Sequence, residues 1–72
     1  MSANTSSHLV KMANQIAFSI PAATSAERIA STALHISNFW SPLMKRQIEE
    51  YLAGGGQDLS KEASAAIGKM LG

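Results

Sequence analysis

Two histidines, His8 and His35, are the residues of this 72-residue chain that could suggest acid–base chemistry or metal binding. A zinc site needs three or four ligands gathered at one point. A histidine base needs a nucleophile and a group that orients it. The two histidines are 27 positions apart, the chain has no Cys, and no Gly-rich phosphate loop is present. The five carboxylates include no pair set in an apolar segment. We therefore expect no catalytic, cofactor-binding or metal-binding residue in this chain.

The composition argues against nucleic acid and membranes as partners. Six Lys and Arg balance five Asp and Glu, and only Lys45 and Arg46 are adjacent, whereas nucleic-acid binding relies on a dense basic patch. No stretch approaches the ~20 apolar residues of a membrane span. Residues 16–26 resemble the core and cleavage site of a signal peptide, but residues 1–10 lack the Lys or Arg that normally precedes one. We expect a cytoplasmic protein.

The length of the chain favours association with another protein. A domain of this size buries only about 60% of the surface that its unfolded chain exposes. Disulfides and thiolate metal sites, two common reinforcements of small domains, are excluded because there is no Cys. Association with a partner or with a second copy is the reinforcement that remains.

The hydrophobic pattern predicts an all-α fold, a small compact array of about four short helices with no sheet. No segment alternates apolar and polar residues with the period of a strand. We expect residues 1–6 to form a disordered N-terminal end and residues 7–72 a single helical domain. We expect the first helix to run from Ser7 to Ser19 and to end before Pro21. The second should begin at a capping box of Thr24 and Glu27, the third at Ser41-Pro42 and the fourth at a cap at Ser60. The glycines 54–56 should end the third helix.

Each predicted helix carries one apolar stripe at the spacing of a buried face. A tight corner is expected where Trp40 is followed by Ser41 and Pro42. The expected buried residues, helix by helix, are Leu9, Met12, Ala13, Ile16, Ala17 and Ile20; Ala26, Ile29, Ala33, Ile36 and Trp40; Met44, Ile48, Tyr51 and Leu52; and Ala63, Ile67, Met70 and Leu71.

Three large apolar side chains, Phe18, Phe39 and Leu43, fall outside these stripes. One explanation is that four helices enclose one another, so that positions flanking a stripe are buried as well. The other is that these side chains form an exposed apolar surface, which usually marks an interaction site. We favour the second, because so small a core has little room for extra aromatic rings.

Polar residues near this surface are further candidates. Lys45 and Arg46 in the first turn of their helix oppose the helix dipole, so they are either solvated or contact an acidic patch on a partner. Asn14 and Gln15 are either solvated or donate hydrogen bonds at an interface, and we favour the interface. The predicted protein interface consists of Asn14, Gln15, Phe18, His35, Phe39, Trp40, Leu43, Lys45 and Arg46.

Three blocks of sequence, residues 8–17 (HLVKMANQIA), 35–44 (HISNFWSPLM) and 54–60 (GGGQDLS), occur in an order that is familiar. Together the blocks resemble the delta subunit of the soluble, NAD-dependent, molybdenum-containing formate dehydrogenases, over about residues 8–71. Two positions depart from the family pattern. Leu43 stands where the pattern Trp-x-Pro-Arg-Met has Arg, and Lys61 stands where the last helix usually begins with Pro.

The resemblance implies a non-catalytic accessory subunit that docks on the catalytic alpha subunit and aids assembly, cofactor insertion or stability of the complex. It also implies that molybdopterin, iron–sulfur clusters, FMN and NAD belong to the partner subunits and that this chain holds no cofactor. The alternative is a self-associating helical adaptor or regulatory module with an unrelated partner, which would form a homo-oligomer when isolated. An enzyme in its own right is the least favoured interpretation.

Overall fold

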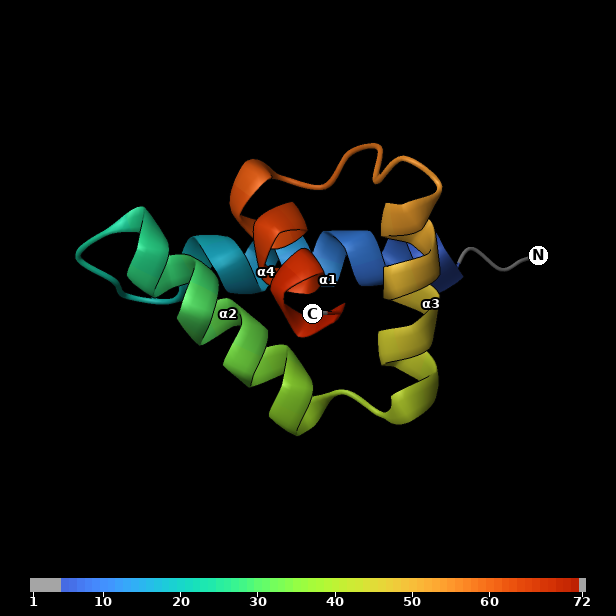
Figure 1. Ribbon diagram of the computed structural model, residues 1–72, viewed down its shortest axis with the longest axis horizontal. Coiled ribbons are helices and arrows are strands. Elements are labelled where there is room, and N and C mark those ends of the chain that lie inside the picture. Colours follow the sequence, from blue (N-terminus) through green and yellow to red (C-terminus); the bar gives the residue numbers. More distant parts are fainter. Residues whose placement is uncertain (1–4, 72) are drawn as a thin grey trace.

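The helices begin and end where the sequence supplies caps and helix breakers. A computed structural model describes residues 5–71, which form four helices: α1 (Thr5–Ser19), α2 (Ser25–Phe39), α3 (Pro42–Ala53) and α4 (Lys61–Leu71) (Figure 1). This part of the chain contains no strand, so the all-α prediction is confirmed. Helix α1 begins two residues before the predicted Ser7. Of the expected disordered end, residues 1–4 lie outside the described residues.

The three predicted N-caps are all present. In each, the side-chain hydroxyl accepts the backbone N–H three residues later, which satisfies a group that has no partner within the helix. At α2 the Glu27 carboxylate also accepts the N–H of Ala23 at 3.0 Å, which completes a variant of the capping box. The cap distances are 3.1 Å from Thr24 to Glu27, 3.2 Å from Ser41 to Met44 and 3.1 Å from Ser60 to Ala63.

The C-terminal helix α4 packs against each of the other three helices, and its contact with α2 is the most extensive in the structure. In Figure 1, α4 lies across the middle of the molecule in front of α1, with α2 on one side and α3 on the other. The connection between α1 and α2 projects at one end of the molecule, and the corner between α2 and α3 lies away from it.

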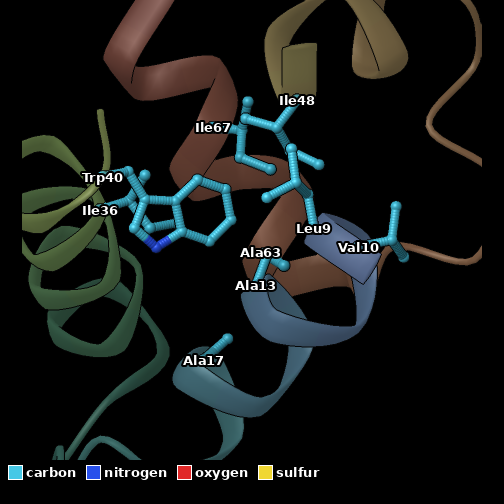
Figure 2. Packing of buried hydrophobic residues seen from close by; sticks show 9 residues of the cluster. All are labelled: Leu9, Val10, Ala13, Ala17, Ile36, Trp40, Ile48, Ala63 and Ile67. Atoms are coloured by element: carbon cyan, nitrogen blue, oxygen red, sulfur yellow. The ribbon is translucent and has the colours of Figure 1, made fainter. Parts of the chain in front are cut away.

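Aliphatic side chains from all four helices surround the indole of Trp40 (Figure 2). Ile36, Ile48 and Ile67 are completely buried, and so are Ala13 and Ala63. The remaining members of this core are Leu9, Val10 and Ala17, with Met12, Ile16, Met44, Tyr51, Leu52, Leu59 and Met70 packed around it.

The predicted stripes are therefore confirmed in their main residues, with one error and three omissions. Ala26 is exposed rather than buried, because the first turn of α2 lies at the projecting end of the molecule. The side chain of Leu71 lies outside the described residues. The buried residues that the stripes did not include are Val10, Thr32 and Ala66.

Candidate docking surface

The three apolar side chains left over from the predicted stripes are exposed in the structure. Phe18 has 87% of its surface exposed, Phe39 74% and Leu43 61%. Enclosure by neighbouring helices, the other explanation for their positions, is wrong for all three. Leu34, on the outer side of α2, is exposed to 62% as well, and the sequence analysis did not include it.

Phe39 and Leu43 lie on either side of the corner between α2 and α3. Phe39 is the last residue of α2, and Leu43 is the second residue of α3. One turn before Phe39, the exposed ring of His35 lies with its centroid 4.7 Å from the Phe39 centroid, tilted by 37°. Aromatic pairs at this separation stabilise each other. His35, Phe39 and Leu43 are therefore exposed at this corner or one turn from it.

Trp40 occupies a different position from the other candidates. It is only 6% exposed and belongs to the core, as its place on the α2 stripe predicted. Figure 2 shows its ring directed toward the side chains of the other helices. Trp40 therefore supports the corner from beneath, and its ring is not a free contact surface in this structure.

The two bases of α3 differ in their surroundings. Lys45 is half-buried, and its Nζ donates a hydrogen bond of 3.1 Å to the backbone oxygen of Ser37 in the last turn of α2. A cation at this end of a helix is stabilised by the helix dipole. Arg46 is exposed. Of the pair expected to face an acidic patch, only Arg46 is fully presented to solvent.

Arg28 has an important role that the sequence analysis missed. Its Nη1 donates to the backbone oxygens of Ala17, of Phe18 at 3.1 Å and of Ile20 at 2.7 Å. These carbonyls belong to the end of α1, where Pro21 prevents another turn and the oxygens have no partner within the helix. Arg28 therefore fixes the end of α1 that carries Phe18. The one signal in the sequence was the absence of a basic residue from the last turn of α1.

Asn14 joins α1 to the loop before α4. Its Nδ2 donates to the backbone oxygen of Asp58 and its Oδ1 accepts from the backbone N–H of Ser60, both at 2.8 Å. Asp58 has a positive φ of 71°, so this carbonyl is presented by an unusual turn of the backbone. The side-chain amide is thus engaged within the chain, and Gln15 beside it is exposed. Contacts of Asn14 and Gln15 with a partner stay a prediction.

A groove lies beside Phe18, between the end of α1, the start of α2 and the loop that leads into α4. It has a volume of about 550 Å³. On another side of Phe18 is a shallower hollow that Lys11, Gln15 and Ser19 also line. The residues that line the groove are Asn14, Ala17, Phe18, Arg28, Asp58, Ser60 and Glu62.

Within residues 5–71, no three His, Asp or Glu side chains gather where they could hold a metal ion. None of the helices formed there is long and apolar enough to cross a membrane.

Comparison with known proteins identifies the family. Residues 8–67 match the family model described as NADH-dependent formate dehydrogenase delta subunit FdsD. The match covers most of the chain and includes the caps of α2, α3 and α4, Asn14 with its two loop contacts, and all four exposed large apolar residues. No curated protein and no solved structure matches the chain. The chain belongs to the family of formate dehydrogenase delta subunits.

Proposed function

We propose that this chain is a non-catalytic accessory subunit that docks on the catalytic alpha subunit of formate dehydrogenase and aids assembly, cofactor insertion or stability. The observation that carries the proposal is the exposure of Phe18, Phe39 and Leu43 outside the core that the four helices form. Membership in the delta subunit family indicates the complex to which the partner belongs.

Burial of these side chains would contribute favourably to docking. Burying a Phe or Leu side chain contributes roughly 1.5–3 kcal/mol. Three such residues would together contribute several kcal/mol before the costs of association are subtracted. A partner that binds only the folded form of a protein also stabilises it. Docking would therefore raise the stability of this small domain.

In this proposal molybdopterin, the iron–sulfur clusters, FMN and NAD are held by the partner subunits. The delta subunit contributes a rigid surface, on which a part of the alpha subunit is held in its folded conformation. Such a contact would assist the alpha subunit while its cofactors are inserted.

The proposal is tested by recovering the tagged chain from its own cells grown on formate and identifying the bound proteins by mass spectrometry. We expect a large molybdenum- and iron–sulfur-containing subunit in near-equal amount. Recovery of this chain alone, or with an unrelated protein, would contradict the proposal.

Light scattering at low micromolar concentration then distinguishes the alternative. A tight homo-oligomer that keeps its mass when mixed with the formate dehydrogenase subunits would identify a self-associating module. Formate-dependent reduction of NAD by the purified chain alone would overturn its assignment as non-catalytic.

A further inference from the structure

We propose that the groove beside Phe18 receives a segment of the alpha subunit that carries an Arg or Lys next to an aliphatic side chain. This inference rests on the proposed function and specifies the chemistry of one contact. It is carried by the residues that line the groove, among them an exposed Phe from α1 and two acidic residues from the following loop and α4.

The groove has one apolar wall and one polar wall. Phe18, 87% exposed, and the buried Ala17 form the apolar wall at the end of α1. Asp58 and Ser60 from the loop, with Glu62 from the first turn of α4, form the polar wall. Pockets of roughly 300–1,000 Å³ hold ligands in other proteins, and the volume here, about 550 Å³, accommodates a few side chains.

The charges of the lining determine the sign of the occupant. The guanidinium of Arg28 is directed at the backbone oxygens that end α1, so its positive charge is offset by the negative end of that helix. Asp58 contacts Asn14 through its backbone oxygen, which leaves its carboxylate outside that hydrogen bond. The lining has two acidic residues and one arginine, and the guanidinium of that arginine already donates to backbone oxygens. The groove is therefore net negative, which favours a cation as the occupant.

A basic side chain fits both walls at once. The face of an aromatic ring attracts a cation placed over it, and a carboxylate forms strong hydrogen bonds with a guanidinium or ammonium. Arginine matches this combination best, because its planar group stacks on a ring while its edge donates to carboxylates. An aliphatic neighbour would cover the rest of the Phe18 ring.

The walls of the groove are fixed before any partner binds. Arg28 ties the end of α1 to α2, and Asn14 ties α1 to the loop that carries Asp58 and Ser60. A preformed site loses less conformational entropy on binding than one that must be ordered. The groove is therefore suited to recognise one segment.

The test measures binding of the full-length chain to the purified alpha subunit at several salt concentrations. The variant is Asp58→Asn with Glu62→Gln, which removes both charges. Asn is suitable at position 58 because it tolerates the positive φ of 71°, and because the hydrogen bond to Asn14 uses the backbone oxygen. The matched control is Glu49→Gln with Glu50→Gln, which removes two carboxylates from α3.

We expect the groove variant to bind about five- to tenfold more weakly at low salt, which corresponds to roughly 1–1.4 kcal/mol for two partly exposed ion pairs. Its affinity should also depend less on salt than that of the unmodified chain. Phe18→Ala should weaken binding at every salt concentration, and the control on α3 should bind like the unmodified chain. Circular dichroism of each variant establishes that it is folded.

Three results would overturn the inference, and each has a different meaning. If the unmodified chain binds the alpha subunit and the groove variant binds equally well with the same salt dependence, the groove is not the contact, although the docking proposal stands. If the unmodified chain does not bind the alpha subunit, both proposals are wrong. A dimer of the unmodified chain that the groove variant abolishes would show that the occupant is a second copy, which also overturns the inference.

Discussion

Arg28 and Lys45 occupy the same position in successive helices, and each donates to backbone oxygens at the end of the helix before it. Arg28 is the fourth residue of α2 and contacts the end of α1, whereas Lys45 is the fourth residue of α3 and contacts Ser37 near the end of α2. Neither α1 nor α2 has a basic residue in its own last turn. A cation near a helix C-terminus stabilises that helix. At both corners this cation belongs to the following helix.

Replacing these two residues by Met should have unequal effects. Arg28→Met should lower the free energy of unfolding by about 1.5–3 kcal/mol, because three carbonyls lose a charged donor in a partly buried site. Lys45→Met removes one exposed hydrogen bond and should cost about 0.5–1 kcal/mol. Urea unfolding followed by circular dichroism measures both. Arg28→Lys should recover only part of the loss, since an ammonium lacks the planar set of N–H donors of a guanidinium. Losses of equal size for Arg28→Met and Lys45→Met would contradict this account.

Asn14→Ala should destabilise the fold although the residue is on the polar side of α1. The substitution leaves the backbone N–H of Ser60 and the oxygen of Asp58 without their partner, and we expect a loss of about 1–3 kcal/mol. Gln15→Ala is the neighbouring control, because Gln15 is exposed and should change the stability by less than about 0.5 kcal/mol. Similar values for the two variants would show that the Asn14 contacts are unimportant.

Thr32→Val should leave the stability unchanged or increase it. Thr32 is completely buried, and its Oγ1 has no hydrogen-bond partner among residues 5–71. Replacing that hydroxyl by a methyl group of similar shape removes the cost of burying an unsatisfied polar atom, which is of the order of 1–3 kcal/mol. Thermal unfolding should therefore occur at the same or a higher temperature. Thr32→Ser, which keeps the hydroxyl and loses a methyl group, should melt at a lower temperature.

Phe39→Ala and Trp40→Ala should separate docking from folding. Phe39 is 74% exposed and pairs with the exposed ring of His35, so its replacement should cost no more than about 1 kcal/mol of stability and should reduce recovery of the complex. Trp40 is in the core, so its replacement should cost about 3–5 kcal/mol and reduce recovery by unfolding the chain. Glu50→Ala should do neither. Equal recovery of the complex with all three variants would exclude the α2–α3 corner as a contact.

The helices and three of the four exposed large apolar residues could be predicted because both depend on local spacing; Leu34 was missed. The hydroxyl residues Thr24, Ser41 and Ser60 mark helix starts through contacts only three residues long. The positions of Phe18 and Phe39 outside their stripes follow from the rotation of 100° per residue along a helix. Their exposure follows from the small size of the core. The docking surface itself stays a prediction, since a single chain does not contain its partner.

The rest depended on contacts between elements. Arg28 reaches back 8 to 11 residues, and the two contacts of Asn14 span 44 and 46 residues, so neither has a signature in a helical window. Val10, Thr32 and Ala66 lie beside their stripes and are buried because neighbouring helices cover more than one face. Ala26 is on its stripe and exposed because no helix covers the projecting turn.

The hydrogen bonds of Asn14 also have a consequence for the order of events during synthesis. A ribosome makes residue 14 long before Asp58 and Ser60, and the helix that packs against α1, α2 and α3 alike is the last of the four. The early helices therefore lack their main packing partner until α4 has been translated. The groove beside Phe18 forms only after its last lining residues, Asp58, Ser60 and Glu62, have been made. Any recognition through that groove is restricted to chains whose folding is complete.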